Sequence, residues 1–243
     1  MSIENKRYLK DNKYLDWLAG ITDGDGCFTI SKKGYVSFEL TVETSNLKCL
    51  YRIKTVFGGN IKPGKGKWHR YKLHHKEGII NIVNSLNGRL RNPVRILQLD
   101  KVCALYNIKL LDTPSLNYSS NWLSGFFDAD GSIYINTTFV QVFISISQKD
   151  KYLLDQIAFV YGGKVYPHGT TNTFKWIVNK KIEVLAMTEY FKKFPLISKK
   201  MIRANLIPSI YEGYSRNWHK KRLNMVEEKK WKELLEKWSN YDI

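Results

Sequence analysis

The feature that most constrains this chain is a nine-residue pattern that occurs twice. Residues 18–26 are LAGITDGDG and residues 123–131 are LSGFFDADG, and a tryptophan stands just before each copy, Trp17 and Trp122. The copies are roughly a hundred residues apart, which is typical of a duplicated domain, whereas solenoid repeats have periods of about 20–50 residues. The sequence therefore predicts two related structural units in one chain of 243 residues.

The similarity between the two halves continues beyond the nonapeptides. In each half the motif is followed by two segments of alternating polar and apolar residues, and then by a helical pattern that ends at a Gly-Gly pair (58–59 and 162–163). More strand and a further helix follow in both halves. Alternation with period 2 is typical of strands with one buried face, and period 3.6 of amphipathic helices. The expected fold class is α+β, with two pseudo-symmetric αββαββα repeats.

Changes in composition divide the chain around these repeats. The segment between them contains Pro114 and a polar cluster, which are typical of a linker. In the C-terminal segment, Trp231, Leu234, Leu235 and Trp238 recur at helical spacing. The predicted divisions are an N-terminal extension (1–13), a first repeat (14–106), the linker (107–120), a second repeat (121–212) and a C-terminal helical tail (213–243).

The charge of the chain indicates the chemistry of its partner. There are 39 Lys and Arg residues against 22 Asp and Glu, a formal net charge of +17, and the commonest polyanion for a basic protein is nucleic acid.

Other classes of protein are not expected from the sequence. No segment reaches 18 apolar residues, so a membrane partner is not expected. The first fifteen residues have no apolar h-region and contain acids, so they do not fit a secretory signal or a transit peptide. Three widely spaced cysteines predict neither a disulfide framework nor a zinc site.

The polar faces of the alternating segments carry candidate nucleic-acid ligands. An ordinary solvated face gives the same alternation, but hydroxyl, amide, Tyr and Lys side chains in a chain of this charge favour contacts to bases and phosphates. In the first half these residues are Thr29, Ser31, Lys33, Tyr35, Ser37, Glu39 and Thr41. In the second half they are Tyr134, Asn136, Thr138, Gln141, Phe143 and Ser145.

The two Asp-x-Asp-Gly segments do not fit a calcium loop. An EF-hand needs an oxygen ligand at position 5 and Gly at position 6. Counted from Asp23 or from Asp128, position 6 holds Phe28 or Ile133. A histidine-based nuclease site is also not expected, because the adjacent His74 and His75 point to opposite faces of a strand. The motifs therefore need another explanation.

Small residues four positions apart predict that the two motif helices pack against each other. Gly20 and Gly24 recur in the first motif, and Gly125 and Ala129 in the second, and this spacing lets two helix backbones approach closely. The expected interface residues are Ala19, Gly20, Ser124 and Gly125.

Close packing of the two helices would bring their last acids, Asp25 and Asp130, together. Helix C-termini already carry partial negative charge, so two carboxylates there need a cation. Oxygen ligands with room for water suit Mg²⁺, which serves phosphodiester hydrolysis. A turn-capping role is the alternative for a single Asp, and the duplication favours the metal site. For the earlier acids of each motif, Asp23 and Asp128, we expect a structural role.

The two motifs resemble those of the LAGLIDADG homing endonucleases, in the single-chain form with two repeats. The resemblance covers residues 14–212 and implies two curved antiparallel sheets that form a saddle on duplex DNA, with the two motif helices packed between them. It implies that Asp25 and Asp130 bind the catalytic metal and position the attacking water, and that the carbonyls of Gly24 and Ala129 complete the metal shell. The implied cofactor is Mg²⁺, which Mn²⁺ or another divalent metal can replace.

The resemblance also implies further residues near the metals. Gln148 fits a glutamine at a strand end, whereas the counterpart in the first half is Thr44, so unequal activity of the two half-sites is expected. Lys76 and Lys180 fit the basic residue that stabilises the phosphate in the transition state. A solvated surface lysine is the alternative interpretation for each. The predicted base-contacting residues are those of the polar faces given above.

The function implied by the resemblance is intron homing, with a metal-dependent double-strand break in a long DNA target. The implied protein is a monomer that is encoded in an organelle and acts in the mitochondrion, with duplex DNA and its own intron RNA as partners. Two alternatives stay open: a maturase that binds the intron RNA and assists splicing, and a non-cleaving DNA-binding relative. Divalent-metal dependence of strand scission distinguishes the nuclease from both.

Overall fold

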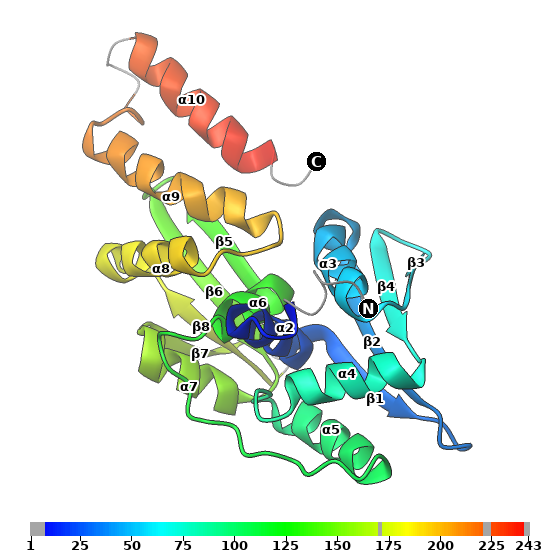
Figure 1. Cartoon of the computed structure of the whole chain (residues 1–243). Helices are drawn as coiled ribbons and strands as arrows, with labels where there is room; N and C mark the ends of the chain where they lie inside the picture. Colours follow the sequence, from blue (N-terminus) through cyan, green and yellow to red (C-terminus); the bar gives the residue numbers. More distant parts are fainter. Residues whose placement is uncertain (1–7, 170–171, 221–224, 241–243) are drawn as a thin grey trace. The chain divides into compact units, whose positions relative to one another are not determined.

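The computed structural model describes residues 8–169, 172–220 and 225–240. The chain forms two compact units, one up to Asp130 and the other from Gly131 onward, which we call the first and the second unit (Figure 1). The remaining parts of the predicted N-terminal extension and C-terminal tail lie outside the described residues.

The first unit contains one four-stranded antiparallel sheet with strand order β1-β2-β4-β3. The second motif helix, α6, also belongs to this unit. Its elements are α2 (Asn12–Asp25), β1 (Gly26–Ile30), β2 (Val36–Glu43), the 3₁₀ turn η1 (Thr44–Asn46), α3 (Leu47–Phe57), β3 (Asn60–Pro63), β4 (Trp68–Leu73), α4 (Lys76–Leu86), α5 (Pro93–Leu105) and α6 (Trp122–Asp130).

The second unit has a sheet of the same design, with strand order β5-β6-β8-β7. Its elements are β5 (Gly131–Asn136), β6 (Gln141–Gln148), α7 (Lys151–Tyr161), β7 (Lys164–His168), β8 (Thr173–Val178), α8 (Lys181–Lys193), α9 (Lys200–Ser215) and α10 (Met225–Ser239). Counted from each motif helix, both halves have the order αββαββα, so the predicted α+β fold with two repeats is confirmed.

One face of each sheet is covered by helices and forms the core of its unit. In the first unit the side chains of Phe38, Leu40 and Tyr71 are fully buried, and α3 and α4 pack against β2. In the second unit Ile146 and Trp176 take the same positions in the core. The opposite face, which we call the outer face, carries most of the polar residues of the strands, as the alternation predicts.

The Gly-Gly pairs follow helices α3 and α7 because the chain needs a backbone with positive φ there. Helices α3 and α7 both have eleven residues, and their C-caps are Gly58 with φ of 76° and Gly162 with φ of 78°. A Cβ disfavours this region, and glycine is the usual residue at such a helix end. The indole nitrogen of Trp176 donates to the carbonyl of Gly162 at 2.7 Å, which fixes the turn to the sheet.

The motif helices α2 and α6 pack backbone against backbone within the first unit. A Cβ on Gly20 would overlap the carbonyl oxygen of Trp122 and lie 2.6 Å from the Phe126 nitrogen. A Cβ on Gly125 would likewise overlap the carbonyl oxygen of Trp17. Only glycine permits this approach, since a Cβ contact under 3.0 Å requires something to move. The residues predicted for the interface, Ala19, Gly20, Ser124 and Gly125, are all buried.

The linker and the tail are both held to their own units. Linker residue Leu111 donates its N–H to Asn87 Oδ1 at 2.8 Å, and Thr113 Oγ1 donates to the Leu90 carbonyl at 2.7 Å. In the tail, α10 packs on α9 and buries the predicted residues Trp231, Leu234 and Trp238, while Leu235 is half-buried. Within the described residues, no helix combines the length and the apolar character that crossing a membrane requires.

We expect Gly20→Ala to destabilise the fold by about 1–3 kcal/mol or more, because the new methyl group would force the two motif helices apart. Urea or thermal unfolding measures this change. Gly66→Ala is the matched control, since its Cβ would lie 3.4 Å from Trp68 Cδ1, in ordinary contact. Equal stability of the two variants would contradict the close packing of α2 and α6.

Candidate active site

The last acids of the two motifs converge at the C-terminal ends of α2 and α6. Asp25 is the last residue of α2 and Asp130 the last residue of α6. A Cβ on Gly24 would overlap the Ala129 side chain and lie 2.8 Å from Asp130 Oδ2. The Asp130 carboxylate therefore lies against the last turn of the other motif helix, beside Asp25. Both acids are half-buried, so they remain accessible to a ligand.

The earlier acids of the motifs are buried and bind across the helix pair. Trp122 Nε1 donates to Asp23 Oδ2 at 2.7 Å, and Trp17 Nε1 donates to Asp128 Oδ2 at 2.8 Å. Each motif helix thus supplies a tryptophan donor to the carboxylate of the other. Asp23 is 0% and Asp128 3% exposed, which matches the structural role expected for both. The reciprocal pairs fix the register of α2 against α6.

Asp23 also fixes the start of helix α5. The backbone nitrogens of Arg91 and Asn92 donate to its carboxylate at 2.8 and 3.1 Å, and Asn92 Nδ2 donates to its carbonyl at 3.0 Å. Burial raises the pKa of Asp23 to about 7, and the hydrogen bonds from Arg91, Trp122 and Asn92 act in the opposite direction. Asn92 is in turn the N-cap of α5 and accepts the N–H of Val94.

This anchoring of α5 places Arg95 beside the first motif. Arg95 Nη2 lies 3.4 Å from the Gly24 carbonyl oxygen, and Nη1 lies 3.5 Å from Gln98 Oε1. Gln98 Oε1 also accepts the N–H of Phe28 at 3.2 Å. Both contacts of Arg95 are long for hydrogen bonds and therefore weak. A guanidinium in this position can give up these two contacts and instead donate two hydrogen bonds to a phosphate.

Arg95 is a residue that the sequence did not reveal. The sequence instead indicated Lys76 and Lys180 as the basic residues. Lys76 is the exposed first residue of α4. Lys180 is the N-cap of α8, where its Nζ lies 3.7 Å from Glu183 Oε1. The sequence did contain one indication of the position of Arg95. The pair Asn92-Pro93 is typical of a helix start, and it puts Arg95 in the first turn of that helix.

The strand registers change the counterpart of Gln148. In the first sheet one row contains Gly26, Leu40 and Tyr71, and in the second sheet the equivalent row contains Gly131, Ile146 and Trp176. Two positions further along, Val42 pairs with His69, and Gln148 pairs with Phe174. The sheet position that is equivalent to Gln148 is therefore Val42.

Thr44, which the sequence matched with Gln148, lies beyond the strand. It begins the turn η1, and its Oγ1 lies 3.2 Å from His69 Nδ1. The turn η1 has no equivalent between β6 and α7, so the spacing from strand to helix differs between the two halves. The two halves thus differ in the backbone at this strand end, while the unequal activity of the two half-sites stays a prediction.

The predicted base-contacting residues of the first unit lie on the outer face of its sheet (Thr29, Ser37, Glu39 and Thr41) and in the loop between β1 and β2 (Ser31, Lys33 and Tyr35). Thr29 Oγ1 and Ser37 Oγ lie 2.8 Å apart, and Ser31 Oγ accepts the Tyr35 N–H at 3.0 Å. Lys33 is an exposed residue of the loop between β1 and β2. Thr41 is opposite Arg70 of β4. Glu39 binds two cations that the sequence did not single out, with Lys72 Nζ at 2.7 Å and Arg70 Nη1 at 3.5 Å.

In the second unit the predicted residues are distributed differently. The Tyr134 and Phe143 rings stack at 4.9 Å, and Gln141 Nε2 lies 3.5 Å from the Asn179 carbonyl oxygen. Asn136 Oδ1 accepts the N–H of Thr138 at 3.0 Å, so it stabilises the turn after β5. Ser145 is only 1% exposed, so its hydroxyl is not presented to solvent.

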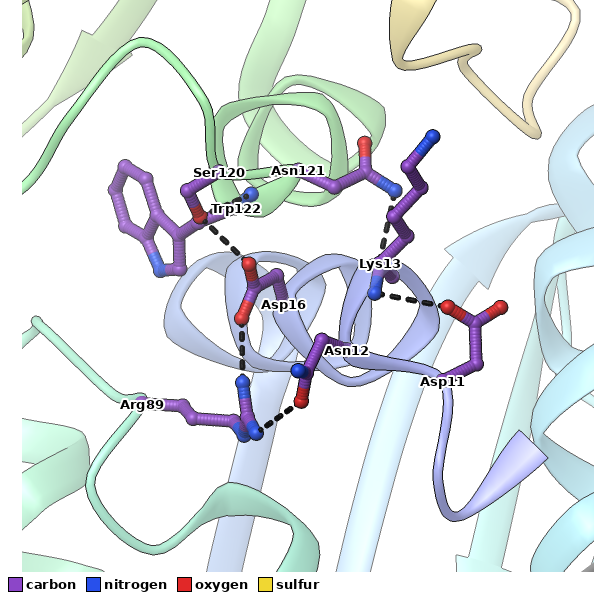
Figure 2. Close-up of polar contacts among 8 residues, drawn as sticks. All are labelled: Asp11, Asn12, Lys13, Asp16, Arg89, Ser120, Asn121 and Trp122. Atoms are coloured by element: carbon purple, nitrogen blue, oxygen red, sulfur yellow. Dashed lines mark hydrogen bonds and ion pairs between the residues drawn. The ribbon is translucent and has the colours of Figure 1, made fainter. Parts of the chain in front are cut away.

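The opposite ends of the motif helices are joined by a polar network (Figure 2). Asp16 accepts Arg89 Nη1 at 2.7 Å on one oxygen and Ser120 Oγ at 3.0 Å on the other. Arg89 Nη2 also donates to Asn12 Oδ1 at 2.9 Å, and Asn121 Nδ2 donates to the Lys13 carbonyl at 2.9 Å. This network links the start of α2 to the start of α6, so the helix pair is fixed at both ends.

The donor set at the converging acids suits a hard divalent cation. Within the described part of the chain, no group of three or more His, Cys, Asp and Glu side chains could hold a metal ion. The site offers two carboxylates, and the carbonyls of Gly24 and Ala129 precede them. Mg²⁺ is commonly bound through one or two carboxylates, with water and substrate phosphates completing its shell. These residues therefore fit such an ion.

Comparison with known proteins identifies the family. The family model of the LAGLIDADG endonuclease matches residues 18–105 and again residues 123–211. The chain belongs to the LAGLIDADG endonuclease family. It is 39% identical to the intron-encoded RNA maturase bI4 of Saccharomyces cerevisiae over 94% of this chain and 37% of that protein. It is 35% identical to the probable intron-encoded endonuclease aI2 of Debaryomyces hansenii over 97% of this chain and 39% of that protein.

Other relatives match over most of their length. The intron-encoded DNA endonuclease ai2b of Dictyostelium discoideum is 34% identical over 94% of this chain and 90% of that protein. Among solved structures, the LAGLIDADG homing endonuclease I-GzeII in complex with its DNA target has a TM-score of 0.66 at 16% identity, over 90% of this chain and 96% of that chain. This likeness establishes the fold. The chain spans about two fifths of the length of the maturase and of the aI2 endonuclease.

We expect Trp122→Phe to lower the free energy of unfolding by about 1–3 kcal/mol, because Asp23 loses a donor while it stays buried. Chemical denaturation measures this loss. Trp231→Phe is the control for ring size, since the indole nitrogen of Trp231 makes no hydrogen bond within the described residues. If the two variants lose the same stability, the Trp122–Asp23 bond contributes nothing beyond packing.

Proposed function

We propose that this protein is a site-specific DNA endonuclease that hydrolyses phosphodiester bonds in both strands of a long duplex target, as in intron homing. The observation that carries the proposal is the convergence of Asp25 and Asp130 at the ends of two tightly packed helices. Endonuclease relatives that align with 94% or more of this chain support it. The net charge of +17 supports a nucleic-acid substrate.

In this proposal Asp25 and Asp130 hold divalent metal, Mg²⁺ or a substitute such as Mn²⁺, with the carbonyls of Gly24 and Ala129. Bound there, the metal supplies Lewis-acid activation of the phosphate and lowers the pKa of a bound water. The carboxylates orient that water for attack on phosphorus. They are held in place because the helix pair cannot slide, since its register is fixed by the two Trp–Asp pairs.

Arg95 has the position to stabilise the charge that develops on the phosphate near the first motif. Its guanidinium lies beside the Gly24 carbonyl because α5 is anchored to the motif helices. Fixed donors aimed at developing charge contribute strongly to catalysis, because they need no reorganisation during the reaction. Lys76 and Lys180 remain predictions for the same role, and Gln148 for a supporting one.

A second candidate function is that of an RNA maturase. The observation that favours it is the 39% identity to a protein named as an intron-encoded RNA maturase. Such a function would use the basic surface to bind the intron RNA and would not require the two aspartates. Both functions fit the same charge, so affinity for nucleic acid alone does not separate them.

We also propose that the protein acts as a monomer in the mitochondrion. One chain supplies both motif acids, so a second copy is not needed to complete the site. The mitochondrial assignment rests on the relatives, which are named as intron-encoded proteins.

We expect Asp25→Asn and Asp130→Asn each to reduce double-strand cleavage at least about a hundredfold while binding persists, because each removes a metal ligand but keeps the shape of the side chain. Cleavage is measured on a plasmid library of candidate intron-insertion sequences with Mg²⁺ or EDTA, and binding in EDTA. Asp155→Asn is the control, since Asp155 is an exposed acid paired with Lys151. Undiminished cleavage in either motif variant would refute the two-carboxylate mechanism.

We expect Arg95→Met to slow cleavage of one strand about tenfold or more, so that nicked DNA accumulates, with Arg95→Lys intermediate. The ratio of nicked to linear plasmid measures this effect at saturating enzyme. Lys76→Met is the comparison, because it tests the lysine that the sequence indicated. A larger loss with Lys76→Met than with Arg95→Met would return the role to the lysine.

A further inference from the structure

The outer faces of the two sheets carry different chemistry at equivalent positions. Equivalence follows from the rows that contain Gly26 and Gly131. In the first sheet Glu39 pairs with Lys72. At the equivalent places in the second sheet, Ser145 pairs with Ile177. A charged pair in one half is thus replaced by an uncharged pair in the other.

The first sheet presents a positioned arginine. Arg70 Nη1 lies 3.5 Å from Glu39 Oε2, and the guanidinium carbon lies 5.4 Å from the centre of the Trp68 ring. Trp68 is itself packed against Gly64, where a Cβ would overlap the indole. The side chain of Arg70 is 50% exposed. An ion pair this exposed contributes little to stability, and together with the Trp68 ring it favours this position of the guanidinium.

An arginine that is held in this way can discriminate between bases. Arginine donates two parallel hydrogen bonds to O6 and N7 of guanine in the major groove, and a planar fork that is already oriented loses less entropy on binding. The carboxylate of Glu39 also accepts Lys72 at 2.7 Å, so Glu39 positions both cations. Guanine is therefore the base whose edge complements Arg70.

The second sheet presents an aromatic pair at the positions where the first sheet has Thr29 and Ser37. Tyr134 and Phe143 are direct cross-strand partners, with ring centres 4.9 Å apart and an interplanar angle of 3°. Lys175 Nζ lies 5.1 Å from the centre of the Tyr134 ring. The four strands β5 to β8 contain no Asp or Glu. The surface therefore combines apolar ring edges with a cation and carries no charge that would repel phosphates.

We propose that the two sheets recognise different bases: Arg70, positioned by Glu39 and Trp68, contacts guanine, and the Tyr134–Phe143 pair contacts thymine methyl groups. In the major groove the C5 methyl group is the apolar feature of thymine, and aromatic side chains contact it. The inference rests on the proposed binding of duplex DNA and adds to it the chemistry of each half-site. The target is then asymmetric, with guanine selected in one flank and thymine in the other.

The test is selection of bound sequences from a randomised duplex library by the full chain and its variants. Arg70→Lys keeps the charge but loses the fork, and should relax a guanine preference in one flank by roughly 5- to 100-fold. Phe143→Ala should relax a thymine preference in the other flank only. Arg216→Lys and Phe159→Ala are the matched controls, because both residues are exposed, Arg216 at the C-cap of α9 and Phe159 on α7, and neither should change the selected sequence.

A second measurement leaves the protein unchanged, so it does not depend on how well Phe143→Ala folds. Replacing thymine by deoxyuracil in the selected target removes only methyl groups, and should weaken binding of the wild type about fourfold for each methyl group that the aromatic pair touches. The loss should be confined to the flank that Phe143→Ala affects. Phe143→Ala should bind the two targets equally.

The outcomes separate this inference from the proposed function. Specific DNA binding without guanine or thymine selection, or with both variants acting on the same flank, overturns the inference and leaves the nuclease intact. Wild-type binding that is indifferent to deoxyuracil overturns the thymine contact. If the aromatic pair instead supports tight binding of single-stranded RNA, with no binding of duplex DNA, both the inference and the proposed nuclease are refuted.

Discussion

The close packing of α2 and α6 is the constraint on which the rest of the site depends. Gly20 and Gly125 let each backbone contact the other directly, and the buried carboxylates of Asp23 and Asp128 are then within reach of the indole donors of the opposite helix. A buried carboxylate without donors is costly. Each motif helix is therefore stable in this position only with its partner, and the last acids of the two motifs converge as a consequence.

Asp23 connects this packing to the chemistry of the site. Its carboxylate accepts the backbone nitrogens that precede α5 as well as the indole nitrogen of Trp122. The start of α5 is thereby tied to the helix pair, and Arg95 in its first turn comes to lie at the Gly24 carbonyl. A single buried acid thus contributes to both the helix register and the position of a cation. In the proposed function the two acids of this motif have separate roles, since Asp23 positions these elements and Asp25 binds the metal.

The two sheets share a topology and an apolar inner face, but the chemistry of their outer faces differs. The inner rows keep large apolar residues in both units, such as Leu40 and Ile146. The outer rows do not share such a set, because the pair of Glu39 with Lys72 in one unit is replaced by Ser145 and Ile177 in the other. Duplicated units can therefore keep one core and bind two unlike partners or half-sites.

The sequence by itself determined the elements, their order and the packing of the motif helices, because these follow from local periodicity, Gly-Gly helix ends and the spacing of small residues. It also indicated Asp25 and Asp130, since matching motifs mark equivalent ends. Only the tertiary structure decided that Arg95 reaches the first motif, that Asp23 and Asp128 bind the opposite tryptophans, and that Val42 is the sheet position equivalent to Gln148. Those features depend on contacts between distant residues and on strand register, which turn lengths set and no local pattern records.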